Sequence, residues 1–551
     1  IRQGRREGLE AGRFVDLMLI AKISTVSVHL CGPVDELACF HQHDTLKRAF
    51  VQHMQFDTAV AEPLMAAPVQ PTVHSAAASM GWQPMRSSGT ALVEQLVEHF
   101  AGLIRNHGLR VGMRLPSVRA LAQSAGVSRD TVVQAYDKLA AQGLLQSRRG
   151  SGFYVAAQRR VMEPAAVAVV PAEVVEFDTA YLLRGIFRDD GENTGGAGCL
   201  PPSWMDQGLI TGAMRAISRQ GARAELGFLS YGHPQGFLPL RQQIASNLQA
   251  QEVPAHPEAN LMTVGGVTQG LDLIVRCFLK PGDTVLVEDP AWFLIFGRLK
   301  YMGVNVVGVP RLPGGPDVMA LESLAQAHKP RLFILNTAVH NPTGLSLSAG
   351  VAHEVLRIAE RHDFLLVEDD TYADFLGAMP LRLAAMDRLQ RVILVGGYSK
   401  TLSGGLRVGY LAAKPEYVHR LTDMKLLAGL TSSLPAEQVV HHILADGSFR
   451  KHVDRLRERV DRARNRCLRK LEALGCYAEH EPVAGTFAWV DCGVDTEVLA
   501  RQAAASQLLL APGVLFSPRQ ATSSMLRVPV AMADHIAPWK LLEQILGQLR
   551  R

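Results

Sequence analysis

The hydrophobic and polar positions first become regular after an N-terminal segment that has no clear period. Apolar residues recur at helical spacing over 91–106, and shorter helical patterns cover 117–125 and 129–142. Only Gly126-Val127-Ser128 separates the last two patterns, and Ser128 is a suitable N-cap for the helix that follows. The pattern therefore predicts three helices, with a tight turn between the second and the third.

Two short strand-like segments follow at 144–147 and 153–155, and the turn between them carries Arg148 and Arg149. A helix-turn-helix followed by such a basic hairpin is a winged helix-turn-helix. Its last helix enters the major groove of DNA through the N-terminal end, while the hairpin reaches phosphates or the minor groove. The candidate DNA-contacting residues are Arg119, Ser128, Arg129, Asp130, Thr131, Gln134, Arg148 and Arg149.

Residues 178–551 show alternating strand and helix patterns, which predict an α/β domain with a mostly parallel sheet. The apolar runs 364–367 and 391–395 are typical of buried strands, and the first of them leads directly into acidic residues. Residues 156–177 contain Pro, Ala, Val and Glu without a clean period, so we interpret them as an interdomain linker. The predicted domains are therefore 89–155 and 178–551.

Composition limits the class of protein. The chain has 551 residues, of which 48% are hydrophobic and 20% are charged, as expected for more than one globular domain with large cores. It has no apolar run of about 18 residues, so no membrane span is expected. Its seven cysteines are few, odd in number and scattered, which favours a reducing cytoplasm over a disulfide framework.

The net charge of +5 is unevenly distributed. Residues 89–160 contain ten basic and four acidic side chains, a net charge of +6 that leaves the remainder close to neutral. A small basic domain attached to a neutral one indicates nucleic-acid binding. The competing interpretation, three helices that serve only as a packing module, does not account for the two arginines of the hairpin. Arg119 has an alternative role of its own, an ion pair that braces the fold.

Residues 1–88 form an N-terminal extension that we expect to be partly disordered, since 58–79 turns to Ala, Pro, Val and Ser. The first residue is Ile, and Met80 is the expected start. Two cysteines and two histidines lie between 31 and 43, but their spacing matches no usual zinc pattern, so no metal site is expected. The apolar run 14–20 is too short for a signal peptide.

Lys400 stands in a stretch of small residues directly after the apolar run 391–395. A lysine held in a dry pocket next to another cation has a lowered pKa and acts as an amine nucleophile. Its natural electrophile is the aldehyde of pyridoxal 5′-phosphate (PLP), and Arg407 with the glycines and serines around it suits a phosphate. Taken alone, the stretch is also compatible with a solvated lysine on a surface loop.

Other strand ends carry side chains that suit the same cofactor. The segment 263–266 predicts a strand and a glycine turn, so Val267 and Thr268 begin a helix whose free N–H groups bind phosphate. Trp292 follows another strand and offers a ring that stacks on a flat heterocycle, and Asn341 offers an amide.

Three further residues complete the set. The Asp369 carboxylate suits a protonated pyridine nitrogen, and Tyr372 supplies a phenolic hydrogen bond. Arg527 lies in a short strand, where its guanidinium suits the carboxylate of a substrate. Each motif is weak alone, and their common order along the chain is what favours one site.

Two resemblances follow from these motifs. The segment 115–122, the turn after it, Tyr136 and the ending Gly150-Ser151-Gly152-Phe153-Tyr154-Val155 resemble the DNA-binding domain of the GntR family. The motifs around Lys400 resemble the fold-type I, aspartate aminotransferase-like PLP enzymes. With both parts in this order, the chain from residue 89 onward resembles the MocR subfamily of GntR regulators.

The resemblance implies a role for each matching residue. Lys400 would be the Schiff-base lysine, Asp369 would hold the pyridine nitrogen protonated and Tyr372 would bond the phenolic oxygen, so these three are the candidate catalytic residues. Asn341 would also bond the phenolic oxygen, and Trp292 would stack on the ring. The candidate phosphate-binding residues are Val267, Thr268, Ser399 and Arg407, together with Tyr231 from the partner subunit of a homodimer. Arg527 would bind the carboxylate of an amino-acid ligand.

The chain departs from the family's pattern at two positions. Gly397 stands where relatives often have a serine, which removes one possible hydroxyl contact to the phosphate. Trp292 stands where tyrosine is commoner, which keeps the stacking surface and loses the hydroxyl.

The resemblance implies a cytoplasmic, PLP-dependent transcription regulator of the MocR/GntR type. Such a homodimer binds double-stranded DNA and senses an amino acid, an amine or a vitamin B6 form through the Lys400 aldimine. The alternative is a catalytically active aminotransferase, acting on an amino acid and a 2-oxo acid, that carries a DNA-binding domain. A third hypothesis, a DNA-binding protein with a cofactor-free domain, is disfavoured because none of the principal residues is missing.

Overall fold

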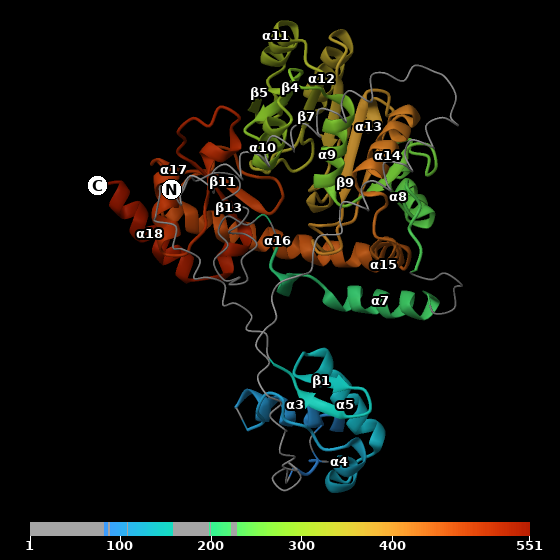
Figure 1. Cartoon of the computed structure of the whole chain (residues 1–551). Helices are drawn as coiled ribbons and strands as arrows, with labels where there is room; N and C mark the ends of the chain where they lie inside the picture. The colour runs from blue at the N-terminus through green and yellow to red at the C-terminus, as the bar shows by residue number, and fades with distance from the viewer. Residues whose placement is uncertain are drawn as a thin grey trace, which may run out of the picture. The chain divides into compact units, whose positions relative to one another are not determined.

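The computed structural model describes residues 82–157 except 86, 88 and 107, residue 198, residues 200–221 and residues 229–551 (Figure 1). The chain divides into two compact units, Ile1–Val169 and Val170–Arg551. The predictions for the segment before Trp82, including the Met80 start and the cysteines and histidines between 31 and 43, lie outside the described residues, as does the linker after 157.

The first unit contains three helices followed by a hairpin, in the predicted order. Its elements are α3 (Leu92–Arg105), α4 (Val118–Ala125), α5 (Arg129–Ala141), β1 (Leu145–Arg148) and β2 (Gly152–Val155). The two strands pair antiparallel, with Leu145 opposite Val155. Each helix begins and ends within about two residues of the position that the hydrophobic pattern predicts.

Local capping sets the turn between α4 and α5. Gly126 adopts φ 63°, a left-handed conformation that ends α4 and is easily accessible only to glycine. The Ser117 hydroxyl accepts a hydrogen bond from the Ala120 N–H at 3.2 Å, and the Ser128 hydroxyl accepts one from the Thr131 N–H at 3.0 Å. Each serine thus satisfies one of the free N–H groups at the start of its helix.

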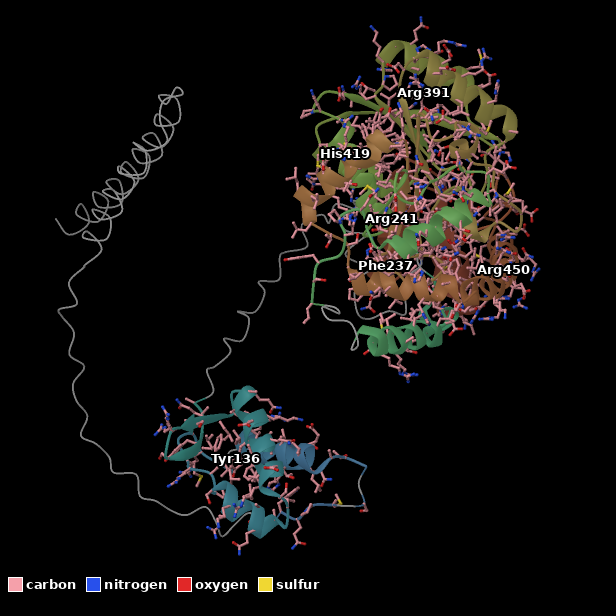
Figure 2. The ribbon with its side chains drawn as sticks, turned by 90° about the vertical axis from the view of Figure 1, so that its right-hand side faces the viewer. Tyr136, Phe237, Arg241, Arg391, His419 and Arg450 are labelled. Carbon is pink, nitrogen blue, oxygen red and sulfur yellow. The ribbon has the colours of Figure 1, made fainter. Side chains whose placement is uncertain are left out.

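The core of the first unit closes around Tyr136, which is fully buried (Figure 2). Its ring packs edge-on against Phe100 with 5.8 Å between centroids, and its hydroxyl donates to the Pro116 carbonyl at 3.0 Å. Trp82 packs against this core, and Gln95 exchanges two hydrogen bonds with the backbone of Met85. The packed unit therefore extends N-terminally to Trp82, beyond the predicted first residue.

The second unit is built on an eight-stranded sheet in the order β3-β10-β9-β8-β7-β4-β5-β6. The bounds are β3 (Leu261–Val264), β4 (Thr284–Asp289), β5 (Asn305–Leu312), β6 (Gly315–Pro316), β7 (Leu332–Leu335), β8 (Leu365–Asp369), β9 (Val392–Gly397) and β10 (Gly409–Ala412). The five strands from β9 to β5 are parallel, whereas β10 runs antiparallel to both of its neighbours and β6 runs antiparallel to β5. The prediction of an α/β domain with a mostly parallel sheet is confirmed.

Both faces of this sheet are covered, which explains why its strands read as continuous apolar runs. Phe333 and Leu335 of β7 join one hydrophobic cluster, and Leu332 and Ile334 join the other, because successive side chains point to opposite faces. The other helices of this part of the chain are α7 (Gln207–Gly221), α8 (Leu238–Gln249), α9 (Val267–Phe278), α10 (Phe293–Tyr301), α11 (Val318–His328), α12 (Ala349–Arg361), α13 (Leu383–Met386), α14 (Pro415–Gly429) and α15 (Leu434–Ala445).

A long helix, α16 (Ser448–Ala473), leads from α15 to a second, smaller sheet (Figure 1). That sheet is antiparallel in the order β11-β13-β12 and packs with two further helices on the C-terminal half of α16. Its elements are β11 (Phe487–Asp491), α17 (Thr496–Ala505), β12 (Ala511–Pro512), β13 (Met525–Pro529) and α18 (Ala537–Leu549). In the part of the chain that the structure describes, no helix is both long enough and apolar enough to span a bilayer.

Candidate functional sites

The carboxyl ends of four parallel strands carry the residues that the sequence singled out in the second unit. Lys400 follows β9, Asp369 is the last residue of β8, Asn341 follows β7 and Trp292 follows β4. These strands are neighbours in the sheet, so their carboxyl ends meet at one edge. The sheet topology therefore gathers residues that are more than a hundred positions apart in the chain.

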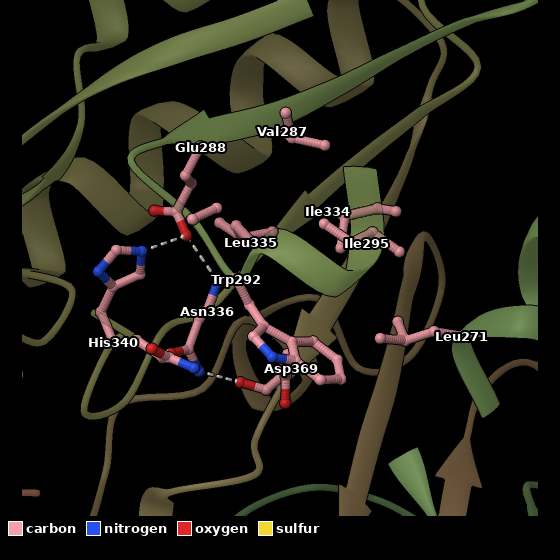
Figure 3. Close-up of a pocket in the computed structure, with 12 residues that line it drawn as sticks. Leu271, Val287, Glu288, Trp292, Ile295, Ile334, Leu335, Asn336, His340 and Asp369 are labelled. Carbon is pink, nitrogen blue, oxygen red and sulfur yellow. Dashed lines mark hydrogen bonds and ion pairs between the residues drawn. The ribbon is translucent and has the colours of Figure 1, made fainter. Parts of the chain in front are cut away.

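A pocket opens at this edge, and Trp292, Asn341 and Asp369 all line it (Figure 3). Its other lining residues are the apolar Leu271, Val287, Ala291, Ile295, Ile334 and Leu335 and the polar Glu288, Asn336 and His340. The pocket thus combines an apolar wall with a polar one, as sites for flat, partly charged ligands do.

The Asp369 carboxylate is held by its own loop. One of its oxygens accepts hydrogen bonds from the Thr371 N–H at 2.9 Å and from the Thr371 hydroxyl at 2.5 Å. Removal from water raises the pKa of Asp369 to about 6, against these bonds and the nearby Lys400, which lower it. A protonated ring nitrogen placed at this carboxylate would stabilise its ionised form.

The Lys400 amine points into the unit. Its Nζ donates to the Gly198 carbonyl at 2.6 Å and lies 5.9 Å from the centre of the Tyr372 ring. A Cβ added at Gly198 would lie 3.7 Å from Nζ and 3.5 Å from the Phe487 ring. Lys400 and Tyr372 are therefore close together, and an aromatic residue of the small sheet lies beside them.

A cradle for an anion forms where α9 begins. Gly266, at φ 82°, precedes Val267 and Thr268, whose N–H groups belong to the first turn of the helix. Arg407 donates to the Gly265 carbonyl at 2.9 Å and to the Ser399 hydroxyl at 3.2 Å. A Cβ at Gly266 would come within 2.5 Å of the Arg407 guanidinium, so only glycine permits this approach.

The cradle brings together all four residues that the sequence assigned to the phosphate within one chain. A helix N-terminus, a guanidinium and a hydroxyl are the groups that bind a phosphate dianion. Gly397 lies beside it, and a Cβ there would lie 3.3 Å from both Gly409 Cα and Val267 Cγ2. The serine that relatives often have at this position would therefore require a small adjustment of the backbone around it.

A polar network in one wall of the pocket was not predicted from the sequence. The Asn336 side chain accepts a hydrogen bond from the Asn341 N–H at 2.9 Å and donates to the Asp369 carbonyl at 2.5 Å. The Asn336 N–H donates in turn to Glu288 at 2.7 Å, and Figure 3 shows these contacts on one wall of the pocket. Asn336 therefore fixes the backbone of two predicted site residues at once.

Glu288 is held in this network by a buried ion pair. It pairs with Arg311, and both side chains are only 1% exposed. Burial raises the pKa of Glu288, and the Arg311 charge opposes that rise. His340 Nε2 lies 3.5 Å from the Glu288 carboxylate, but burial holds the His340 pKa well below its usual value, so the ring is neutral.

Arg527 reaches the pocket from the small sheet. It lies opposite Trp489 in the β11–β13 pairing and is 2% exposed. Its Nη1 donates to the Asn341 side-chain oxygen at 3.2 Å, and its guanidinium lies 4.3 Å from the Phe487 ring centre and 5.0 Å from that of Phe516. Asn341 therefore links the two sheets of this unit, and a fixed cation stands next to the pocket.

Tyr231 is the one predicted cofactor residue that does not join this cluster. Its side chain is 80% exposed. An exposed ring is what a contact to a second copy of the chain requires, and that contact stays a prediction.

The predicted DNA-contacting residues of the first unit lie at the surface. Arg129, Asp130 and Gln134 are exposed on α5. Ser128 and Thr131 are already engaged with each other, because their hydroxyls lie 2.8 Å apart in the cap. Two of the five residues predicted on this helix end thus shape the helix start, and the other three project into solvent.

The hairpin and α4 add three exposed arginines. Arg148 lies over the Tyr154 ring, 4.5 Å from its centre, and Arg149 is at the turn. Arg119 takes part in none of the ion pairs among the residues that the structure describes, so the alternative of an ion pair that braces the fold gains no support. Its charge remains free for a phosphate.

Comparison with known proteins assigns both parts of the chain to known families. A family model described as aminotransferase class I and II matches residues 193–536, and a model described as bacterial regulatory proteins of the gntR family matches residues 92–155. The chain is 28% identical over 422 residues to the uncharacterized HTH-type transcriptional regulator YisV of Bacillus subtilis, covering 74% of this chain and 86% of that protein.

Two enzymes are similar to the second unit. The 2-aminoadipate transaminase of Thermus thermophilus is 31% identical over 336 residues, which cover 58% of this chain and 81% of the enzyme. The crystal structure of the multiple substrate aminotransferase from Thermococcus profundus superposes with a TM-score of 0.59 at 26% identity, covering 67% of this chain and 93% of that one. Proteins with this aminotransferase fold depend on PLP, and the pocket, the Lys400 amine and the cradle at α9 fit that cofactor.

Proposed function

Because the chain belongs to the aminotransferase class I and II family and carries a GntR-type DNA-binding domain in front, as MocR-type regulators do, we propose that it is a PLP-dependent transcription regulator. In this proposal it acts as a cytoplasmic homodimer on double-stranded DNA and senses an amino acid, an amine or a vitamin B6 form. The observation that carries the proposal is the presence, in one chain, of a lysine-centred cofactor site and a helix-turn-helix whose recognition end is exposed.

We propose the following contacts for the cofactor, as the resemblance to the family implies. Lys400 would hold it covalently, Asp369 would face the ring nitrogen and Trp292 would cover the ring. Asn341 and Tyr372 would bond the phenolic oxygen. The phosphate would lie in the cradle of Val267, Thr268, Ser399 and Arg407, with Tyr231 of a second copy added to it. When bound, the cofactor supplies an electron-withdrawing ring and a carbon that a ligand's amine can attack.

The remaining residues position the ligand. Arg527 presents a buried cation for a carboxylate, surrounded by the rings of Phe487 and Phe516 that keep water away. Lys400 would be the side chain that the ligand's amine displaces. Asn341 contacts Arg527 and, through Asn336, the loop of Asp369, so binding at one end changes the contacts at the other.

Regulation requires that the ligand prefer one of two states of the protein. An effector shifts such an equilibrium only by its difference in affinity for the two states. We propose that the ligand-bound and ligand-free states of the second unit differ in how the DNA-binding units of a dimer engage their two half-sites.

The test is selection of genomic fragments by the purified, PLP-loaded protein, followed by footprinting with and without candidate amino acids. We expect discrete sites with paired half-sites, and a footprint or affinity that changes with one ligand class. Binding that is weak, insensitive to sequence and steeply dependent on salt would contradict the regulator. Steady-state turnover of an amino acid with a 2-oxo acid, in that case, would identify an aminotransferase instead.

A further inference from the structure

Two cysteines face each other in the second unit, away from the cofactor pocket. Tyr477 and Asp491 form an antiparallel bridge and exchange both backbone hydrogen bonds, at 3.0 and 2.8 Å. In an antiparallel pair, the residues next to such a bonded pair form a non-hydrogen-bonded pair, with Cα atoms about 4.5 Å apart. Cys476 and Cys492 occupy that neighbouring pair.

The backbone and the burial agree with this placement. The Cys492 N–H donates to the Ser524 carbonyl and the Cys476 N–H donates to the Leu471 carbonyl, each at 2.9 Å, so both amides point away from each other. Both cysteines are fully buried, whereas Tyr477 and Asp491 are exposed. Alternation along the strands therefore turns both thiols to the inner face.

The spacing suits a disulfide. Bonded cysteines have Cα atoms about 4.4 to 6.8 Å apart, a range that includes the separation of a non-hydrogen-bonded pair. The bridge 477–491 fixes the two backbones in register, so the thiols can join without a change of strand pairing.

The surroundings of the two thiols favour Cys476 as the nucleophile. Arg550 Nη2 lies 3.6 Å from Cys476 Sγ and donates to the Cys492 carbonyl at 2.7 Å. The hydrogen bond from Cys492, followed by the charge of Arg550, lowers the pKa of Cys476 to about 7. The same hydrogen bond and burial raise the pKa of Cys492. Cys476 therefore ionises in preference to Cys492, which lies beside it.

We propose that Cys476 and Cys492 form a dithiol site that a peroxide oxidises to an intrachain disulfide. The Cys476 thiolate attacks one oxygen of hydrogen peroxide, the O–O bond breaks, and hydroxide leaves and takes up a proton as water. The sulfenic acid formed on Cys476 is then attacked by the Cys492 sulfur, the S–O bond breaks and a second water leaves. The dithiol loses two protons and two electrons overall, and the peroxide is reduced to two waters.

The site has a route to its oxidant and a connection to the rest of the unit. Arg550 is exposed and contacts Cys476 Sγ, so movement of that side chain would open a route for a molecule as small as hydrogen peroxide. Cys492 directly follows β11, which pairs with β13 so that Trp489 lies opposite Arg527. A disulfide would close the loop between the end of α16 and this sheet. The proposal is independent of the DNA-binding function.

A peptide map of the full-length protein tests it. Trypsin releases Leu471–Arg501, which contains both cysteines and no internal Lys or Arg. After hydrogen peroxide treatment and blocking with N-ethylmaleimide, we expect this peptide to carry no maleimide and to be two hydrogen atoms lighter. Cleavage after Glu479 should leave its halves joined until a reductant is added. The untreated protein should carry two maleimides after denaturation.

Single substitutions distinguish the roles of the two thiols. Cys492→Ser should leave a sulfenic acid on Cys476 that dimedone traps, and Cys476→Ser should leave Cys492 unreacted. Cys277→Ser, at a half-buried cysteine elsewhere in the unit, should not change the disulfide yield. The rate should rise with pH and be half-maximal near pH 7. A peptide that keeps two thiols while Cys277 is oxidised would overturn the proposal, and this readout on the unmutated protein holds even if a serine variant fails to fold.

Discussion

The two units of the chain place their functional side chains in opposite environments. In the first unit, Arg129, Gln134 and Arg149 are exposed, and an apolar core around Tyr136 holds the fold without them. In the second unit, the polar groups of the pocket wall are buried and bound to other buried groups: the Asn336 N–H donates to Glu288, and Glu288 pairs with Arg311. Function and stability are therefore separable in the first unit and coupled in the second, since buried polar groups are costly when one partner is lost.

The largest expected effect is that of Lys400→Ala. The variant should lose the covalent attachment of PLP and its visible absorption, and with it the response to the effector, because Lys400 supplies the amine that is proposed to hold the cofactor. Basal DNA binding should remain, since the first unit is unchanged. Absorption spectra and footprints with and without ligand measure both, and Lys451→Ala, at an exposed lysine, is the matched control. An unchanged effector response would contradict the proposed sensing mechanism.

Arg311→Ala should be the most destabilising of the substitutions outside the pocket lining. It leaves the Glu288 carboxylate buried without its ion-pair partner, which costs about 3–5 kcal/mol. It should also weaken PLP binding, because Glu288 holds the Asn336 N–H that positions the Asp369 loop. Urea unfolding and PLP titration measure the two effects.

Arg391→Ala provides the control for this prediction. Arg391 pairs with Asp363 at 2.8 Å, but that carboxylate is 88% exposed. Such a pair contributes roughly 0–1 kcal/mol. Equal losses of unfolding free energy in Arg311→Ala and Arg391→Ala would show that burial does not raise the cost of losing an ion-pair partner here.

Arg129→Ala tests whether function and stability are separable in the first unit. Removing one base-reading or phosphate-binding arginine should weaken operator binding by about 1–3 kcal/mol, roughly a 5- to 150-fold loss, and leave thermal stability unchanged because the side chain is exposed. Fluorescence anisotropy at several salt concentrations distinguishes a base contact from a phosphate contact. Arg110→Ala, at an exposed arginine before α4, should bind as the parent does. A loss of stability in Arg129→Ala would break the separation claimed for this unit.

Asp369→Asn should show, through the pH dependence of stability, that function and stability are coupled in the second unit. The pKa of Asp369 is raised to about 6 in the cofactor-free protein, so the folded state holds its proton more tightly than the unfolded chain does. The stability that this group contributes is present below pH 3.8, the ordinary pKa of an aspartate. It is lost as the pH rises to about 6, the pKa in the folded state. The variant lacks this titration, so it should be more stable than the parent above pH 6 while binding PLP more weakly. Melting curves of the cofactor-free proteins at pH 5 and pH 8 compare them, and a parallel pH dependence would contradict the assignment.

Local chemistry explains which features were predictable from the sequence. The helices of the first unit follow from apolar spacing and the Ser117 and Ser128 caps, and the resemblances to the GntR and aminotransferase families are confirmed. The residues at strand ends were found because parallel strands bring their carboxyl ends together. The individual roles of these residues stay predictions.

The missed features all depend on partners that are distant in sequence. Arg311 and Glu288 lie on adjacent strands, and Asn336 joins two loops through its side chain, yet no local pattern pairs them. Cys476 and Cys492 come together only through the bridge between their neighbours. Trp82 was overlooked because the segment before it reads as linker, although its ring packs on His99 with 5.9 Å between centroids.

The smallest expected effect is the loss of stability when one helix cap is removed in each unit. Ser117→Ala removes the cap of α4 and Ser348→Ala removes that of α12, each at a cost of about 1 kcal/mol. The same free energy should lower the melting temperature of the first unit by about 4–8 °C and that of the larger second unit by less than about 4 °C, because a larger unit has a larger unfolding entropy. Calorimetry of the full chain should show two transitions that respond separately. Ser124→Ala, also on α4 but bonded only to the Leu121 carbonyl, is the control. A single transition shifted by either cap variant would show that the two units unfold together, and the contrast between them would then apply to their sites but not to their stability.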